Sequence, residues 1–225
     1  MANTPTLSVS ARTNLLSLQR TSELIGRTQE RLASGKKVNS AIDDALSYFK
    51  ARSLDNRASD LATVKDGISQ AVNSLKSATD ALESVERVLT QMKALADSAK
   101  AASDSVSRMT YASQFNDLRS QIDTITADAS FGGVNLLKSS PDNLTVRFNE
   151  RGTNTLQIVG ADTTSSTSTG VNVGVASAAV WANIASAAAT TTANATIDSA
   201  IAYIDSALLT VRTRAQTFGT NSAML

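Results

Sequence analysis

Two adjacent carboxylates, Asp43 and Asp44, are the first candidates for acid–base chemistry in this sequence. The 225 residues include no histidine and no cysteine, so any chemistry would rest on carboxylates, Lys, Tyr, Ser and Thr. Thiolate and imidazole metal sites, disulfides and Cys–His or Ser–His–Asp nucleophiles are therefore excluded. Adjacent residues on a helix point about 100° apart and do not converge on one substrate. We expect the two aspartates to serve a helix start or a packing contact, with no catalytic residue, no metal and no cofactor.

A second charged feature is the basic cluster of Lys36 and Lys37 with Arg27 and Arg31. It is either a solvated face or a contact to acidic residues of a neighbouring subunit. The net charge of the chain is only +1, and 18% of its residues are charged. Nucleic-acid binders show a basic excess that neutralises phosphates, so we expect no nucleic-acid partner.

Membrane insertion and a cleaved leader are not indicated by the sequence. No stretch is long and apolar enough to span a bilayer, and we expect no membrane partner. The first 20 residues lack the charged start, continuous apolar run and small-residue cleavage site of a secretory signal peptide. If the protein leaves the cell, we expect another export route.

The elements that carry these residues are predicted to be helices. Apolar residues are 42% of the chain but aromatics only 4%, which suits narrow helix–helix seams better than a thick core. Residues 1–35 predict a helix that follows a short irregular start with Pro5 and ends at Gly35. Its apolar face has gaps at Ser22 and Gln29, which is typical of a helix that needs a partner. That face consists of Ala11, Leu15, Leu18, Ile25 and Leu32.

The most regular pattern predicts a long helix from Ser40 to Ala99, started by a capping box in which Asp43 answers the Ser40 amide. A kink near Gly67 is possible on this pattern. Its apolar seam repeats by three and four residues from Leu61 onward. An intramolecular bundle is favoured over a coiled coil between chains, because two other apolar stripes in the chain need partners.

Those other stripes lie in a helix that begins after Ser103-Asp104 and in a last helix that Gly219 interrupts. Between them, residues 143–160 alternate with period two and predict a β-hairpin, and residues 161–195 predict an exposed loop or a short helix around Trp181. The predicted fold is mainly α: an elongated antiparallel helical bundle or coiled-coil rod with a small β-hairpin at one tip.

Several short motifs, in order, resemble the bacterial flagellin family. They are Gly26, Glu30-Arg31-Leu32-Ala33-Ser34-Gly35, Val38-Asn39-Ser40-Ala41-Ile42-Asp43-Asp44-Ala45, Asp66-Gly67-Ile68-Ser69 and Phe131-Gly132-Gly133-Val134. The resemblance covers about the first 140 residues and, more loosely, the last 30. Two departures are Leu46-Ser47, where the family has Ala-Gly, and Gly132, where it has Asn.

The resemblance implies a structural subunit, not an enzyme, that polymerises into the extracellular flagellar filament for swimming. Residues 1–40 would form an inner-core helix, and residues 41–225 a rod-like domain with a reduced variable loop at about 139–196. The family has a second terminal helix that pairs with the first, and we expect it to lie outside these 225 residues. The expected partners are other flagellin subunits, an export chaperone and hook-associated proteins, with type III export and no cleaved signal peptide.

Subunit packing is expected along the N-terminal seam and the segment Arg31–Ala45. The candidate interface residues are Ala11, Leu15, Leu18, Ile25, Arg31, Leu32, Asn39, Ser40, Asp43, Asp44 and Ala45. The alternative function is an adaptor at the hook–filament junction, which shares the N-terminal pattern. The Asp-Asp-Ala motif and the Phe-Gly-Gly-Val turn favour the filament subunit.

The resemblance also bears on immune recognition. Some flagellins are recognised by an innate immune receptor through an Arg followed four residues later by Leu on the long helix. Leu95 matches the second position, but Gln91 occupies the first. An uncharged amide lacks the charge-assisted contacts of Arg, so we expect weak or absent activation.

Overall fold

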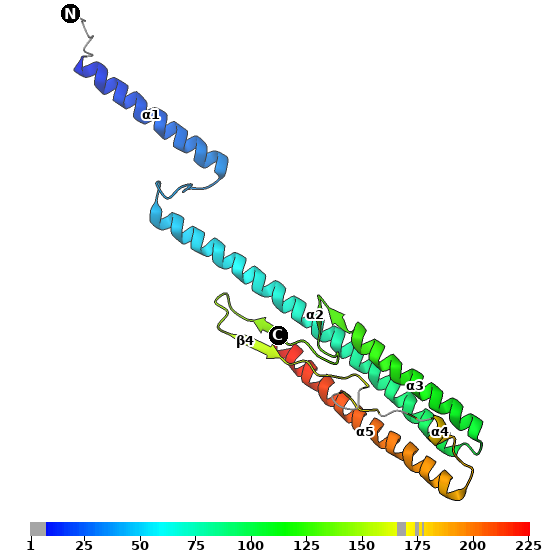
Figure 1. Cartoon of the computed structure of the whole chain (residues 1–225). Coiled ribbons are helices and arrows are strands. Elements are labelled where there is room, and N and C mark those ends of the chain that lie inside the picture. Colours follow the sequence, from blue (N-terminus) through cyan, green and yellow to red (C-terminus); the bar gives the residue numbers. More distant parts are fainter. Residues whose placement is uncertain (1–7, 166–169, 174–175, 177) are drawn as a thin grey trace, which may run out of the picture. The chain divides into compact units, whose positions relative to one another are not determined.

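The computed structural model describes residues 8–165, 170–173, 176 and 178–225. The chain divides into two compact units, Met1–Asp60 and Leu61–Leu225, which are described separately. The first unit contains helix α1 (Val9–Ser34) (Figure 1). The hydroxyl of Ser8 accepts a hydrogen bond from the Ala11 amide, and Gly35 ends the helix in the left-handed region at φ 67°. The predicted stop at Gly35 is confirmed, because glycine adopts this conformation without a Cβ clash.

Helix α2 (Ala45–Ala101) is the long helix of the chain. The capping-box contact exists, since the Ser40 amide donates to the Asp43 carboxylate. It closes a turn that precedes the helix, however, and the predicted helix start at Ser40 is wrong. The helix continues through Gly67 without a break. An exposed glycine costs about 1 kcal/mol relative to alanine, too little to break a helix anchored by a buried seam.

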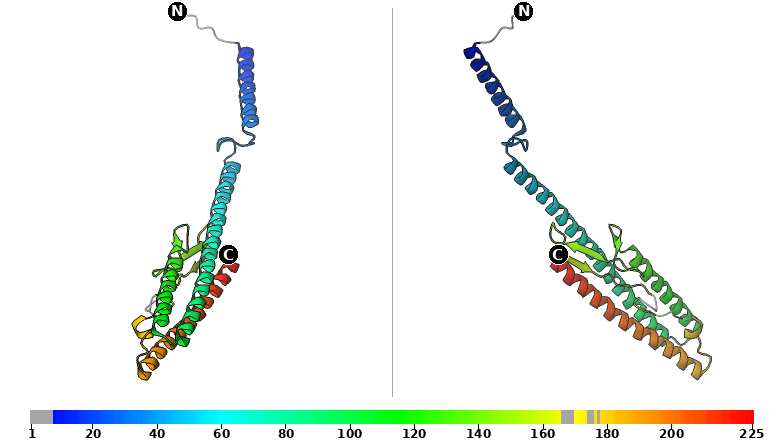
Figure 2. Two further views of the ribbon diagram at one scale, coloured as in Figure 1. Left: turned by 90° about the vertical axis from the view of Figure 1, so that its right-hand side faces the viewer. Right: turned by 60° about the vertical axis from the view of Figure 1, so that its left-hand side comes forward.

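In the second unit, α3 (Ser105–Asp128) and α5 (Ala187–Met224) pack along α2 (Figures 1 and 2). Asp104 caps α3 as predicted, with its carboxylate accepting from the Ser107 amide. The three helices bury their predicted seams against one another. The largest fully buried side chains on them are Leu75, Leu82, Leu89, Met92, Phe115, Ile122, Ile197 and Phe218. The seam of α2 is thus covered within the chain from Ala71 onward.

Ion pairs flank the α2–α5 seam and mark its register. The residues that α2 contributes to these pairs follow one another at intervals of seven. Their partners on α5 also lie seven residues apart, but they occur in the reverse order along the chain. Helices α2 and α5 are therefore antiparallel, with a fixed offset. The three pairs are Glu86–Arg212, Lys93–Asp205 and Lys100–Asp198.

Two small antiparallel sheets follow α3. The first pairs β1 (Ser130–Phe131) with β2 (Val134–Asn135), joined by two glycines at φ 59° and 84°. Both conformations are left-handed, and the departure from the family's Asn at Gly132 is compatible with this turn because both residue types tolerate it. The second sheet pairs β3 (Leu144–Arg147) with β4 (Thr155–Ile158). The predicted hairpin is confirmed, and it lies beside the C-terminal end of α5 (Figure 2).

The segment between the hairpin and α5 agrees with its prediction in the short helix and differs from it in exposure. It contains the short helix α4 (Ala178–Trp181) at the predicted tryptophan. The side chain of Trp181 is only 2% exposed and meets Phe115 edge-on at 5.2 Å between ring centroids. Thr163 and Ser165 are also buried. The expectation of an exposed loop is therefore wrong for these residues; residues 166–169, 174–175 and 177 lie outside the described part.

Hydrogen bonds from α3 explain why this polar segment can be buried. The Asn116 amide donates to the carbonyl of Ala176 and accepts from its main-chain N–H, at 2.7 and 3.1 Å. The Asp123 carboxylate accepts from both the amide and the hydroxyl of Ser165, at 2.7 and 2.8 Å. Main-chain groups that would be costly to bury are thereby satisfied.

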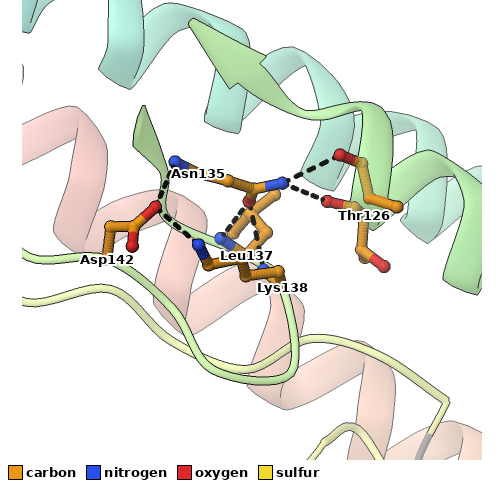
Figure 3. Close-up of polar contacts among 6 residues, drawn as sticks. Thr126, Asn135, Leu137, Lys138 and Asp142 are labelled. Atoms are coloured by element: carbon orange, nitrogen blue, oxygen red, sulfur yellow. Dashed lines mark hydrogen bonds and ion pairs between the residues drawn. The ribbon is translucent and has the colours of Figure 1, made fainter. Parts of the chain in front are cut away.

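Asn135 joins the end of α3 to the loop before the hairpin (Figure 3). Its Nδ2 donates to the carbonyls of Thr126 and Ala127, at 2.9 and 3.0 Å, and its Oδ1 accepts from the amides of Leu137 and Lys138, at 2.8 and 3.1 Å. The side chain is 5% exposed. Asn135 therefore caps the C-terminus of α3 from the following loop.

The Asp142 carboxylate completes this loop (Figure 3). It accepts from the ammonium of Lys138 at 2.8 Å and from the main-chain N–H of Asn135 at 2.9 Å. The Lys138 hydrogen bond, followed by that from Asn135, lowers the pKa of Asp142.

Arg108 is a buried cation at the other end of the bundle. Its guanidinium donates to the carbonyls of Lys100 and Ala102, at 3.1 and 2.9 Å, and to the side-chain oxygen of Asn194 at 3.0 Å. The first two acceptors belong to the C-terminus of α2, where a helix favours positive charge. Arg108 thus ties the end of α2 to α5.

The last helix continues through Gly219, so the predicted interruption there is wrong. Phe218 is 1% exposed and anchors this turn to the core. Across the described residues, no helix is long and apolar enough to cross a membrane.

Candidate subunit interface

The predicted apolar seam of α1 is exposed to solvent in the isolated chain. Leu18 is 70% exposed and Leu32 84%. Leu15 and Ile25 are exposed to about half, and Ala11 is half-buried. No α1 residue is buried. Burial of a leucine side chain is worth about 1.5–3 kcal/mol, so this face offers substantial free energy to a partner that covers it.

A second apolar stripe on α1 escaped the sequence prediction. Val9, Leu16 and Leu24 are 79%, 54% and 60% exposed. At 3.6 residues per turn they lie roughly opposite the first stripe. Their spacing of seven and eight residues in the sequence could have identified this second stripe. A helix with apolar residues on two sides calls for more than one neighbour.

The segment between α1 and α2 is held by local hydrogen bonds. The Nδ2 of Asn39 donates to the carbonyl of Glu30 in the last turns of α1 at 3.4 Å. The amide and hydroxyl of Ser40 both donate to the Asp43 carboxylate at 3.4 Å. These contacts give residues 35–44 a defined turn, which positions Asn39, Ser40 and Asp43 close together.

Asp44, and not Ser40, supplies the contact at the start of α2. Its carboxylate accepts from the amide and the hydroxyl of Ser47, at 3.1 and 2.6 Å, directly before Ala45 begins the helix. The Ser47 hydroxyl and then the Ser47 amide lower the pKa of Asp44. The two aspartates therefore hold different serines: Asp44 acts at the helix start, as expected, and Asp43 closes the turn before it.

The first turns of α2 add exposed apolar residues that the sequence prediction missed. Leu46, Phe49 and Leu54 are 67%, 63% and 66% exposed. Phe49 meets the ring of Tyr48 edge-on at 5.6 Å between centroids. The seam of α2 could have been extended backward from Leu61 to Leu54, which lies seven residues earlier. The described chain leaves this part of the seam uncovered.

The predicted interface residues form an extended strip. Asn39 and Asp44 line one hollow with Lys36, Lys37 and Arg52. Ala11, by contrast, lies about 30 Å along the helix axis from Leu32 at the standard rise per residue. A strip of exposed apolar side chains ending in a polar turn suits contact with a long surface, and it does not converge on a small ligand.

Comparison with known proteins identifies the family. Residues 3–141 match the bacterial flagellin N-terminal helical region, which is more than half of the chain. The chain belongs to the bacterial flagellin family. The crystal structure of Bacillus cereus flagellin resembles this fold with a TM-score of 0.54 and 17% sequence identity, covering 70% of this chain and 82% of that chain. At this identity the likeness shows the fold alone. No curated protein matched the sequence.

Family and fold together make this chain a structural subunit of the flagellar filament, in an extracellular assembly of flagellin subunits. The family match includes α1, the turn that contains Asp43 and Asp44, and α3 as far as the loop of Asn135. The residues that carried the sequence resemblance therefore lie within the matched range. The assignment of individual residues to subunit contacts stays a prediction.

Proposed function

We propose that this flagellin polymerises into a filament that serves swimming, and that its subunits meet through α1 and the segment Arg31–Ala45. The observation that carries the proposal is the exposure of the apolar seam of α1, with Leu32 84% exposed. An isolated helix of this kind gains most of its stability from packing. Covering the seam in a lattice of identical copies sums many weak contacts into a stable polymer.

A two-part organisation supports this assembly. Residues 1–40 form the inner-core helix in this proposal, and residues 41–225 the surrounding rod with the reduced variable segment at about 139–196. The three-helix core buries its seams internally, so the rod keeps its shape while the N-terminal helix contacts neighbours. Export by the flagellar type III apparatus, with its chaperone and with hook-associated proteins as further partners, belongs to the same proposal.

Electron microscopy of the full-length gene product tests the filament role. Purified protein added to preformed flagellar seeds should extend them into filaments. An adaptor at the hook–filament junction would bind the seed ends and stop growth there. Binding without extension would overturn the proposal in favour of the adaptor, and absence of binding would overturn both.

Two variants connect the experiment to the interface. Leu18→Glu places a charge in the exposed seam of α1 and should abolish seed extension without lowering the helix content of the second unit. Leu209→Glu is the matched control, because Leu209 is 69% exposed on α5. Loss of extension with both variants, or with neither, would contradict the assignment to α1.

A further inference from the structure

The two compact units carry opposite charge. Met1–Asp60 contains nine Lys or Arg and six Asp or Glu, for a net charge of +3. Leu61–Leu225 contains twelve Lys or Arg and fourteen Asp or Glu, for a net charge of −2. The near-neutral total therefore hides an asymmetry. Opposite potentials on two parts of a chain favour association of unlike parts from different copies.

The positive charge of the first unit gathers around one exposed leucine at the end of α1. Arg31, Lys36 and Lys37 line a shallow hollow together with Leu32. Leu32 itself is 84% exposed. We name Arg31, Leu32, Lys36 and Lys37 the basic knob. It combines an apolar side chain with flanking cations.

The second unit has a groove of complementary chemistry between α2 and α3. Its lining combines apolar side chains with Ser and Gln side chains, and Asp80 on α2 and Asp128 on α3 supply negative charge. Arg87 is a cation within it, and its guanidinium donates to the hydroxyl of Ser84. Among the described residues, Asp80 and Asp128 take part in no ion pair. We name this surface the acidic groove; it is lined by Ser77, Asp80, Ala81, Ser84, Arg87, Val88, Gln91, Gln121, Ile125, Asp128 and Ala129.

We propose that the basic knob of one copy docks in the acidic groove of a second copy. Leu32 covers the apolar lining residues, while Arg31 and Lys36 face the carboxylates of Asp80 and Asp128. The contact deepens the proposed function and rests on it, since it names surfaces through which filament subunits recognise one another. Knob and groove are different surfaces, so each copy can use its knob on one neighbour and its groove on another. Such a heterologous contact propagates instead of closing on a dimer.

Site-specific crosslinking tests the contact directly, because the natural chain contains no cysteine. A Thr28→Cys variant places a thiol beside the knob, and a Gln121→Cys variant places one in the groove without removing a proposed charge. The two proteins, one carrying an affinity tag, are mixed at low salt with a short bis-maleimide. Thr213→Cys, on an exposed turn of α5 that does not line the groove, replaces the groove variant as the control.

The mixed pair of knob and groove variants should crosslink about tenfold faster than the pair of knob and control variants. The difference should shrink in 0.5 M salt, roughly where the screening length falls to a few ångströms. Equal rates for the two pairs would overturn the proposal.

Charge reversal gives a second, independent readout. Asp80→Lys with Asp128→Lys in the groove protein should slow the crosslink about tenfold, and Arg31→Glu with Lys36→Glu in the knob protein should restore it. Arg87→Gln should accelerate it, because this change removes the groove's cation. All five positions are exposed in the isolated chain, and circular dichroism verifies that each variant stays folded. Failure of the compensating pair to restore the rate would overturn the charge assignment.

These results separate the inference from the proposed function. Seed extension without the preferred crosslink would overturn the knob-and-groove contact and leave the filament role intact. A preferred crosslink in a protein that extends no seeds would support the contact while overturning the filament role.

Discussion

Replacing Asn135 with alanine should destabilise the second unit far more than its location in a two-residue strand suggests. The substitution removes four hydrogen bonds, two to carbonyls at the end of α3 and two from the amides of Leu137 and Lys138. The Leu137 amide is buried, and leaving such a group without a partner costs about 1–3 kcal/mol. With the smaller losses at the other three hydrogen-bonded groups, we expect the free energy of unfolding to fall by about 2–4 kcal/mol in total.

Urea unfolding followed by far-ultraviolet circular dichroism measures this loss as a lower midpoint at unchanged slope. For a unit of this size the melting temperature should fall by roughly 5–15 °C. Asn73→Ala is the matched control, since Asn73 is exposed on α2 and its replacement should change stability by about 0.5 kcal/mol or less. A loss below about 0.5 kcal/mol for Asn135→Ala would refute the capping role.

The Asn135→Asp variant distinguishes capping from simple filling of space. A carboxylate keeps the shape and still accepts from the two amides, but it cannot donate to the carbonyls of Thr126 and Ala127. It also places negative charge at the negative end of α3. The deficit relative to Asn135 should therefore be large at neutral pH and should diminish in acid, where the protonated carboxyl regains a donor. An equal deficit at both pH values would count against this reasoning.

Three further predictions concern pH, packing and recognition. The pKa of Asp142 is lowered by its hydrogen bonds, so its contribution to stability is present above the ordinary carboxyl pKa of about 3.9 and is lost as the pH falls through the lowered value. Asp142→Asn should therefore flatten the acid side of a stability–pH curve measured by urea unfolding. An unchanged acid side would contradict this prediction. Trp181→Ala empties a site that is 98% covered and should lower the free energy of unfolding by about 3–5 kcal/mol; a loss under about 1 kcal/mol would mean that α4 is undocked in solution. The purified protein should activate the innate immune receptor weakly in reporter cells, and Gln91→Arg should raise activation; strong signalling by the natural sequence would refute the prediction.

The repeating seams were predictable because each depends only on local spacing. Leu75, Leu82 and Leu89 recur by seven, and all are fully buried in the bundle. The hairpin was predictable for the same reason, with its change to a period of two residues. What spacing could not supply was the burial of Ala161, Thr163, Ser165, Val171, Val173 and Ala176 in the segment after the hairpin. That burial depends on side chains distant in sequence, such as Asn116, 60 residues before its partner Ala176.

The apolar face of the candidate interface could be predicted from the sequence, but its contacts could not. The pattern identified Leu18 and Leu32 as apolar positions of one seam, and both are exposed. It did not identify the opposite stripe with Leu16 and Leu24, because a heptad search follows one seam at a time. It also misplaced the start of α2, since Ser40 and Asp44 both satisfy the composition of an N-cap. Only the geometry shows that Asp44 makes that bond.

The heptad spacing of the α2–α5 ion pairs means that the rod resists slippage between its helices. A shift of α5 by one heptad would again place apolar side chains in the seam, since Ile197, Ile204, Val211 and Phe218 recur at that interval. In one direction, however, the shift would bring Glu86 opposite Asp205. In the other it would bring Lys93 opposite Arg212. Each displaced alignment thus replaces three ion pairs by one Lys–Asp pair and one pair of like charges, so both shifts are electrostatically less favourable than the observed register.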